Sequence, residues 1–531
     1  MIRTGASRTG LRRLALAGGA VLSLAFASSA SADSYVVLYK GNAVPASAKA
    51  DVEKAGGTFV YGYDAIGVAI ARSNSASFAS RLSSDSRIDG VASTAGFASK
   101  LQDPQGDDGA SGPPPGDLPN APATDADSLS GLQWDMRQIH TPEAHAITGG
   151  SPSVLVGDID TGIDARHPDL RANVDTARSA NCLTGAPVPG AAAANDDNGH
   201  GTHTAGTIAA ASNGYGIVGV APNVKVAAIK AGNADGLFFP EAVICSFMWA
   251  GANHMDVTNN SYFADPWEYN CRNDAVQRAI WKAEQRAIRY AMDQGTTVVA
   301  SAGNDSDDLS HPTTDVTSPD DPPGAAQSRD ITNACVVIPV EIPGVVGVSA
   351  TGSTTQDTSA GDYPDNLKSF YSSYGVSAVD VTAPGGDSVF RTAESVNGRV
   401  LSTWPSTIPC ARSVQEPFPS DPSYPTAHYC YAQGTSMAGP HVAGVAALIV
   451  SRYGSASTPQ NGKLPPGKVA AMIGQTADPQ ACPSTLPPGY LTFTGTNSGA
   501  VQSCQGGPGH NSWYGNGQVD ALNAVTHASG G

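Results

Sequence analysis

Four aspartates fall within twelve positions of the stretch VLVGDIDTGIDARHPDL: Asp158, Asp160, Asp164 and Asp169. Clustered carboxylates are typical of a metal-binding loop or of a catalytic group at the end of a strand. A calcium loop of the EF-hand type needs an oxygen ligand at its fifth position and a glycine at its sixth. Counted from Asp158, these positions hold a glycine and an isoleucine. The spacing therefore excludes an EF-hand loop.

A second interpretation places Asp160 at the carboxyl end of a buried strand, where parallel α/β sheets build their sites. Two further segments carry groups that Asp160 would need. His200 in NGHGTHTAG opens a predicted helix of small residues, and Ser436 in GTSMAGPHVAG follows Gly-Thr at the start of an apolar helix. Free N–H groups and the helix dipole favour a developing anion there. Pro440 is expected in the first turn of this helix, where its missing N–H has no partner.

Each of these residues, taken alone, also has an ordinary structural interpretation. A serine at a helix N-terminus is typically a cap, and a lone aspartate at a strand end caps or is solvated. His203 follows His200 by three positions, but no H-E-x-x-H zinc motif is present, so we interpret it as structural. We assign no chemistry to His441. Asp158 and Asp164 are expected to make structural or surface hydrogen bonds.

The elements that must position these groups follow a first, separate part of the chain. Residues 1–32 have a basic head, the apolar run LALAGGAVLSLAFA and a terminal ASA, which is typical of a secretory signal peptide. Residues 33–100 alternate as β-α-β-β-α-β, the order of a small split βαβ unit. Residues 101–128 are rich in Pro, Gly and Asp, which predicts an exposed linker open to proteolytic cleavage. From 129 to 526, short Val/Ile-rich strands alternate with helices, which indicates a mostly parallel α/β sheet.

Composition narrows the classes of partner. A net charge of −17 argues against nucleic-acid binding, which needs clustered Lys and Arg. Beyond the signal peptide no run approaches the roughly 20 apolar residues of a membrane helix. Eight cysteines without a C-x-x-C pair fit disulfides in an oxidising compartment. Proximity favours Cys410–Cys430 and Cys482–Cys504, and the other pairings stay open.

With these motifs assembled, a family resemblance becomes evident. DIDTGID, HGTHTAG and GTSMAGPHVAG, in this order, resemble the subtilisin-like serine proteases (subtilases, peptidase family S8). SNGYGIVGVAP, VVASAGN and GNGQVDALNAV are similar to further segments of that family, and the resemblance covers roughly residues 132–526. It implies a subtilisin-like α/β fold with a mostly parallel central sheet flanked by helices. The preceding unit resembles the family's inhibitory propeptide, a small α+β domain of ferredoxin-like fold.

The resemblance also implies the roles of the site residues. Ser436 would attack the peptide carbonyl, His200 would accept and return the proton, and Asp160 would orient the imidazole. Asn304, which ends VVASAGN, and the backbone N–H of Ser436 would bind the oxyanion of the tetrahedral intermediate. The expected activity is that of a secreted serine endopeptidase, acting through an acyl-enzyme and made as an autoprocessed zymogen.

Candidate substrate-binding residues are Ser261, Tyr262 and Phe263, which stand where the family commonly has Ser-Leu-Gly, together with Ala302 and Gly303. The opposite rim is expected near residues 234–239. Aromatic rims favour apolar substrate side chains, whereas Asp305, next to Asn304, would favour a basic one. Tyr262 could equally pack inward.

The resemblance further implies a structural calcium site, and no cofactor for catalysis. Asp169 and the side chain of Asn213 would supply ligands, and the carbonyls of Ala211, Tyr215 and Ile217 would complete the shell. Gln133 is a further candidate ligand.

Two other functions stay open. An exopeptidase on the same fold would need an insertion that closes the cleft, and residues 305–334 offer one. A non-catalytic binding module is the other alternative, and the presence of Asp160, His200, Asn304 and Ser436 together argues against it. The expected partners are peptide or protein substrates and the chain's own propeptide, acting on a secreted monomer.

Overall fold

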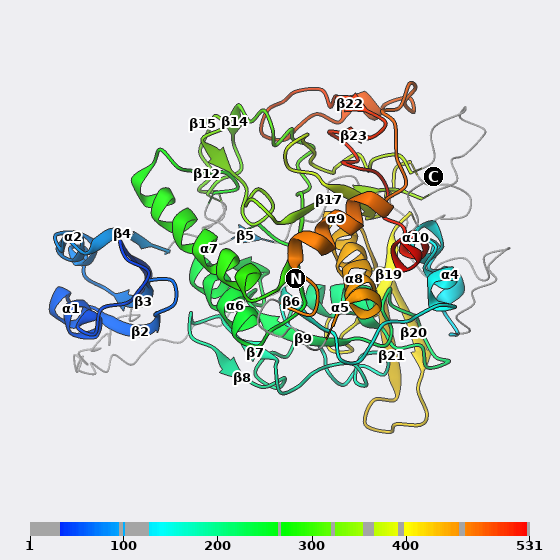
Figure 1. Cartoon of the computed structure of the whole chain (residues 1–531), viewed down its shortest axis with the longest axis horizontal. Helices are drawn as coiled ribbons and strands as arrows, with labels where there is room; N and C mark the ends of the chain where they lie inside the picture. The colour runs from blue at the N-terminus through cyan, green and yellow to red at the C-terminus, as the bar shows by residue number, and fades with distance from the viewer. Residues whose placement is uncertain are drawn as a thin grey trace, which may run out of the picture.

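The computed structural model describes residues 32–94, 99–100, 127–263, 267–319, 324–353, 366–390, 398–455 and 462–527. Residues 1–31 of the predicted signal peptide and residues 101–126 of the predicted linker lie outside these residues. Figure 1 shows a small N-terminal unit, coloured blue, beside a large domain that contains the remaining labelled helices and nearly all the other strands.

The N-terminal unit is a four-stranded antiparallel sheet in the order β2-β3-β1-β4, with two helices. Its core contains Val37, Val52 and Phe78, all fully buried. The element order is the one that the sequence predicts. The elements are β1 (Asp33–Tyr39), α1 (Ala48–Ala55), β2 (Thr58–Tyr63), β3 (Val68–Ser73), α2 (Phe78–Ser83) and β4 (Ile88–Ser93).

The large domain is built on an eight-stranded sheet in the order β18-β17-β13-β11-β6-β9-β7-β8. Neighbouring strands from β18 to β7 pair in parallel, and only β8 pairs antiparallel. The mostly parallel sheet predicted from sequence is therefore confirmed. The strands are β6 (Leu155–Asp160), β7 (Ala180–Asn181), β8 (Val188–Pro189), β9 (Lys225–Lys230), β11 (Val257–Asn260), β13 (Thr297–Ser301), β17 (Val346–Thr351) and β18 (Val381–Pro384).

Helices cover both faces of this sheet (Figure 1). Because strand side chains alternate between faces, Val156 packs with the apolar residues of α5 and α8, whereas Ile159 packs with those of α6 and α7. The sheet is thus buried on both sides, and its strand ends are held rigidly. The four helices are α5 (His200–Ala209), α6 (Pro240–Ala252), α7 (Ala275–Asp293) and α8 (Thr435–Tyr453).

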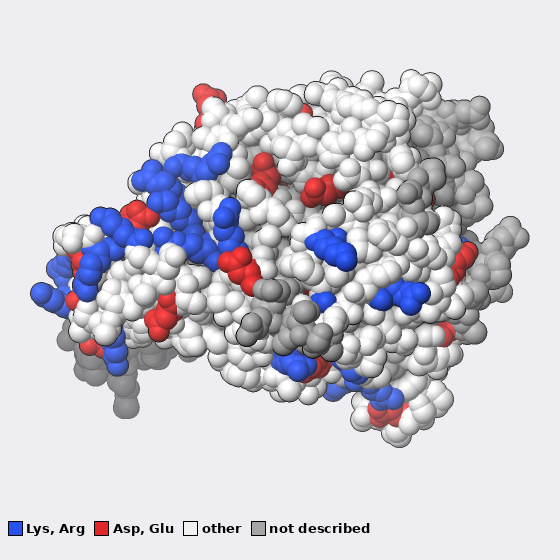
Figure 2. Space-filling model, in the orientation of Figure 1, with Lys and Arg blue, Asp and Glu red and all other residues white. Residues whose placement is uncertain are grey.

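Helix α7 of the large domain forms a contact surface for the N-terminal unit. Its N-terminus is capped by the Asp274 carboxylate, which accepts hydrogen bonds from two backbone N–H groups of the first turn. One face is apolar and buried, and the other carries four cations that gather beside the N-terminal unit in Figure 2. Lys282 pairs with Asp89 at 2.6 Å, and Arg286 donates to the carbonyl of Tyr39 at 3.0 Å. Charge and hydrogen bonds therefore seat the N-terminal unit on this helix.

All eight cysteines form disulfides, which confirms the two pairings that the sequence favours and fixes the other two. The bonds are Cys182–Cys245, Cys271–Cys335, Cys410–Cys430 and Cys482–Cys504. Among the described residues, no helix has the length and apolar character needed to cross a membrane.

Candidate active site

Asp160 and His200 meet at the carboxyl edge of the sheet. Asp160 is the last residue of β6 and is fully buried, and His200 is the first residue of α5. The Nδ1 atom of His200 lies 2.8 Å and 3.0 Å from the two carboxylate oxygens of Asp160. The backbone N–H of Thr161 donates to the same carboxylate at 2.7 Å. This arrangement fixes the ring of His200 and leaves its Nε2 atom to exchange protons.

The start of α5 is held by Asp196, which sequence reasoning overlooked. One of its oxygens accepts from the N–H of Gly199 at 2.9 Å, and the other accepts from the N–H of Thr202 at 3.0 Å. The hydroxyl of Thr161 also donates to Asp196, at 2.9 Å. One carboxylate therefore caps the helix and ties it to the residue after Asp160. An aspartate four residues before the histidine, at a predicted helix start, was the available signal.

The two histidines of α5 have opposite electrostatic environments. Burial alone would lower the pKa of His200, but the charge and hydrogen bond of Asp160 outweigh burial and raise that pKa above its ordinary value. Burial lowers the pKa of His203 to about 3, and its Nε2 atom lies 3.0 Å from the carbonyl of Cys430. His203 is thus a neutral structural residue, as the sequence predicts.

Ser436 is the second residue of α8, whose first residues are tied to the strand ends. Its carbonyl accepts from the Ser261 hydroxyl at 3.0 Å, and the Thr435 carbonyl accepts from the Ser301 hydroxyl at 2.7 Å. The expectation that Pro440 lies in the first turn is wrong, because Pro440 is the sixth residue of the helix. A proline there removes the N–H that would bond the Ser436 carbonyl, and the Ser261 hydroxyl takes its place.

The hydroxyl of Ser436 donates to the carbonyl of Ser261 at 3.1 Å. Proton transfer to His200 therefore requires this hydroxyl to leave the carbonyl, a rearrangement that substrate binding often brings about.

Asn304 lies beyond β13 and faces the start of α8. Its side-chain oxygen accepts from the N–H of Thr435 at 2.9 Å and from the Thr435 hydroxyl at 3.0 Å. The same hydroxyl oxygen accepts from the N–H of Gly303 at 3.1 Å. These bonds hold the amide oxygen toward α8, and the amide N–H₂ at the other end is the group that can donate to a substrate oxygen.

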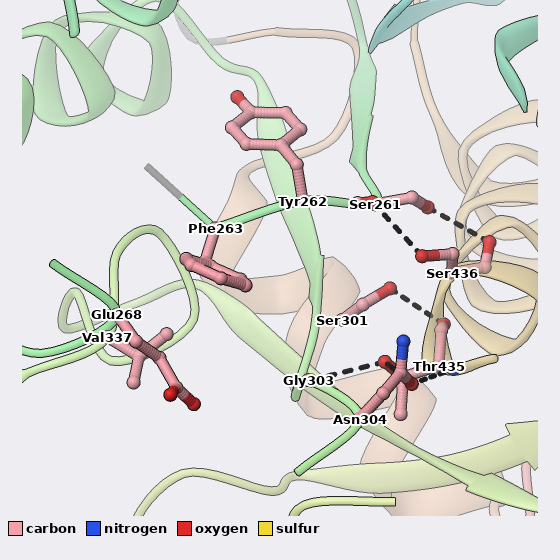
Figure 3. Close-up of a pocket in the computed structure, with 10 residues that line it drawn as sticks. All are labelled: Ser261, Tyr262, Phe263, Glu268, Ser301, Gly303, Asn304, Val337, Thr435 and Ser436. Atoms are coloured by element: carbon pink, nitrogen blue, oxygen red, sulfur yellow. Dashed lines mark hydrogen bonds between the residues drawn. The ribbon is translucent and has the colours of Figure 1, made fainter. Parts of the chain in front are cut away.

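A pocket opens beside Ser436 (Figure 3). It includes four of the five substrate-binding residues that the sequence predicts, while Ala302 lies in the apolar core between two pocket residues. Tyr262 lines the pocket and also packs inward, where its ring stacks on Phe238 at 4.3 Å. Sequence reasoning missed four lining residues, and two of them, Glu268 and Val337, come from segments without a recognisable motif. The pocket is lined by Ser261, Tyr262, Phe263, Glu268, Ser301, Gly303, Asn304, Val337, Thr435 and Ser436.

The predicted calcium loop surrounds Asp169 with hydrogen-bond donors. Its carboxylate accepts from the N–H of Ile217 at 3.1 Å, from the Tyr429 hydroxyl at 2.9 Å and from the Asn213 amide at 3.4 Å. Burial raises the pKa of Asp169 to about 7. A calcium ion needs oxygen atoms that accept, whereas this carboxylate already faces three donors. These contacts do not fit a calcium ion at Asp169, and a measurement with added calcium remains the test of the predicted site.

The two remaining aspartates of the opening stretch make buried structural bonds. Asp158 accepts from the Thr204 hydroxyl at 2.8 Å and from the Asn259 amide at 2.9 Å. Asp164 accepts from the Tyr424 hydroxyl at 3.1 Å. Gln133 uses both ends of its amide on the backbone of Val218, each at 2.9 Å. These residues fix the segments around Asp160 and its neighbouring loops.

Comparison with known proteins places this geometry in a family. The sequence model described as the Subtilase family (Peptidase S8) matches residues 151–517. The chain belongs to the subtilase family. It is 33% identical over 309 residues to subtilisin DY from Bacillus licheniformis, covering 58% of this chain and 80% of that protein. It is 30% identical over 332 residues to subtilisin BL from Lederbergia lenta, covering 62% of this chain and 88% of that protein.

Solved structures agree with the subtilase fold. Fervidolysin from Fervidobacterium pennivorans aligns with a TM-score of 0.61 at 22% identity, covering 93% of this chain and 61% of that one. The epidermin leader peptide processing serine protease from Staphylococcus aureus aligns with a TM-score of 0.59 at 21% identity, covering 94% of this chain and 99% of that one. The predicted fold class is confirmed, and this subtilase is a serine-type hydrolase.

Proposed function

We propose that this subtilase is a secreted endopeptidase that hydrolyses peptide bonds through Asp160, His200 and Ser436. The observation that carries the proposal is the 2.8 Å contact between the buried Asp160 carboxylate and Nδ1 of His200. This contact lies at the sheet edge to which the start of α8 is also tied, and Ser436 lines the pocket there. A buried carboxylate that fixes the tautomer of a histidine is what a general base for serine needs.

In the proposed mechanism, Ser436 Oγ attacks the substrate carbonyl while its proton passes to Nε2 of His200. The negative charge of Asp160 stabilises the resulting imidazolium. The amide of Asn304 and the backbone N–H of Ser436 donate to the oxyanion of the tetrahedral intermediate. Collapse of this intermediate breaks the peptide bond, and His200 returns the proton to the leaving amine. Water then hydrolyses the acyl-enzyme by the same route.

The N-terminal unit is proposed to act as an intramolecular inhibitor that is cut off after folding. The contacts of this unit with α7 support this role, and so does the pairing of strand β5, which follows the unit. Strand β5 (Ser99–Lys100) pairs antiparallel with β10 (Leu237–Phe238), and the ring of Phe238 stacks on Tyr262 of the pocket. The segment that leaves the unit therefore runs along the rim expected for substrate. Residues 1–32 would direct export, and a cut in the linker at 101–128 would release the enzyme as a monomer.

One experiment tests the activity and the processing together. The full chain and its Ser436→Ala variant are expressed with the signal peptide, and both are followed by mass and by labelling with a fluorophosphonate. The wild type is expected to lose its N-terminal unit and to be labelled, while the variant stays longer and unlabelled. A folded wild type that is not labelled and does not cleave casein would exclude the proposed activity.

A further inference from the structure

The pocket beside Ser436 ends at a carboxylate. In Figure 3, Ser436, Thr435 and Asn304 lie at one side of the pocket, and Glu268 lies with Val337 at the opposite side. Among the ten described residues that line the pocket, Glu268 alone has a carboxyl side chain, and none is a lysine, arginine or histidine. The substrate residue whose carbonyl meets Ser436 and Asn304 would place its side chain in this space.

A covalently closed ribbon builds this far end of the pocket. Strand β12 (Asn270–Cys271) pairs antiparallel with β16 (Cys335–Val336), and the Cys271–Cys335 disulfide joins them. Glu268 lies two residues before β12, and Val337 directly follows β16. The ribbon therefore holds Glu268 and Val337 in fixed positions relative to the strand ends that carry the catalytic residues.

The Glu268 carboxylate is buried and anchored by neutral groups. Its residue is 2% exposed. Its Oε2 atom accepts from the Thr317 hydroxyl at 3.1 Å and from the side-chain amide of Asn497. In the described part of the chain, no cationic side chain forms an ion pair with Glu268. Burying an ionised carboxylate without a counter-charge is costly, so a cation that enters the pocket would be strongly favoured.

The charges around Glu268 strengthen this preference. Burial, followed by the negative charges of Asp305, Asp307 and Asp315, raises the pKa of Glu268 well above its ordinary value. Asp315 is paired with Arg329 at 2.5 Å, and Arg329 also donates to the carbonyl of Tyr269 and stacks on an indole ring. Arg329 is thus paired with Asp315 rather than with Glu268, and the electrostatic potential in the pocket remains negative.

We infer that Glu268 makes this pocket selective for Lys or Arg on the amino side of the scissile bond. The inference rests on the proposed protease activity and names its substrate class. The aliphatic stem of Lys or Arg would pack against Tyr262, Phe263 and Val337, and its charged head would pair with the carboxylate. An apolar substrate side chain would fill the same walls but leave the carboxylate without a counter-charge.

The test uses the full chain after it has processed itself and a series of peptides that differ only at the residue before the scissile bond. That residue is arginine, lysine, citrulline or phenylalanine, and citrulline matches the shape of arginine without its charge. The wild type is expected to cleave the arginine peptide with a kcat/KM at least about 100-fold above that of the citrulline peptide. Glu268→Gln is expected to bring this ratio to within a few-fold, because the arginine peptide loses its charged partner.

Two controls keep this result specific. Glu143→Gln makes the same change at an exposed position in α4 (Thr141–His145) and should leave the ratio intact. A glutamine at 268 can still accept from Thr317 and Asn497, so its melting temperature should stay near that of the wild type. If Glu268→Gln nevertheless fails to fold, competition experiments with the wild type alone still test the preference for a cation. Benzamidine, a cation, should then compete with substrate, whereas neutral benzamide should not.

The ratio of the two kcat/KM values also separates Glu268 from the catalytic groups. Ionisation of His200 affects both peptides equally and cancels in the ratio, so a ratio that rises with pH reports on Glu268 and the carboxylates beside it. A wild type that is labelled by fluorophosphonate but prefers citrulline or phenylalanine overturns this inference and leaves the protease activity standing. A Glu268→Gln variant with an unchanged arginine preference overturns it as well. A wild type that is neither labelled nor active rejects the proposed function, and the inference falls with it.

Discussion

The packing of α5 against the loop after β6 sets the distance between Asp160 and His200. Gly201 is the second residue of α5, and a Cβ atom added to it would lie 2.2 Å from the carbonyl oxygen of Gly162. Carbon and oxygen atoms that are not bonded rest at about 3.3 Å or more. A methyl group at this position would therefore push the helix and the loop apart by about 1 Å.

His200 precedes Gly201 and must move with it. A displacement of about 1 Å in a catalytic constellation can cost about 100-fold in rate. We therefore expect Gly201→Ala to lower kcat/KM about 100-fold, and the rate of labelling at Ser436 should fall by a similar factor. Overpacking should also lower the free energy of unfolding by about 1–3 kcal/mol.

The matched control is Gly467→Ala, which adds the same methyl group to the second residue of α9 (Pro466–Thr476). Apart from the neighbouring helix backbone, no atom lies within 4 Å of a Cβ built there, so activity should be unchanged and stability should stay equal or rise by up to about 1 kcal/mol. The assay measures kcat/KM on a chromogenic peptide well below the melting temperature, together with thermal unfolding of both variants. If Gly201→Ala matches the wild type in both measurements, close packing at this contact does not set the geometry of the site.

Four further outcomes are expected. Asn304→Ala should lower kcat about 10²- to 10³-fold with little change in KM, and a rise in KM with kcat unchanged would argue against an oxyanion role. Because the folded state raises the pKa of His200 and catalysis needs its neutral form, kcat/KM should rise with pH through a midpoint above about 6.5, and a midpoint below that value would contradict the assigned cause. The donors around Asp169 predict a melting temperature that EDTA and added calcium leave unchanged, and a calcium-dependent increase would restore the predicted site. Replacing both Cys271 and Cys335 by alanine should cost about 2–4 kcal/mol of stability and reduce the preference for arginine over citrulline, and an intact preference would show that the ribbon does not depend on its disulfide.

The catalytic residues could be predicted because the chemistry restricts their types and the fold restricts their places. Asp160 ends a short strand that lies buried in the parallel sheet, and His200 and Ser436 lie in the first turns of their helices. These segments can be recognised from sequence, because the residue types that each catalytic group needs around it lie within a few neighbouring positions. The parallel sheet followed from the same alternation of strands and helices.

Features that depend on distant partners were not readable. Pro440 is tolerated in the second turn of α8 because the Ser261 hydroxyl donates to the Ser436 carbonyl, which the proline leaves without its helical partner. The loop around Asp169 has the length expected for calcium, yet the Tyr429 hydroxyl, which comes from a distant strand, fills its inner side. In each case a side chain far away in sequence decides which hydrogen-bonding groups a segment must satisfy.

The contrast between locally recognisable residues and residues with distant partners also explains why the residues that set substrate selectivity would not belong to the catalytic motifs. Reaction chemistry requires one arrangement of carboxylate, imidazole and hydroxyl, so the residues that provide it cannot vary in type. A pocket wall needs only the right charge and volume at the right depth, and any rigid segment can provide them. Here Glu268 and Val337 come from the two sides of a ribbon that a disulfide closes, and 69 positions separate them in the sequence. Substitutions on that ribbon should therefore change which peptides are cut while Asp160, His200 and Ser436 continue to cut them.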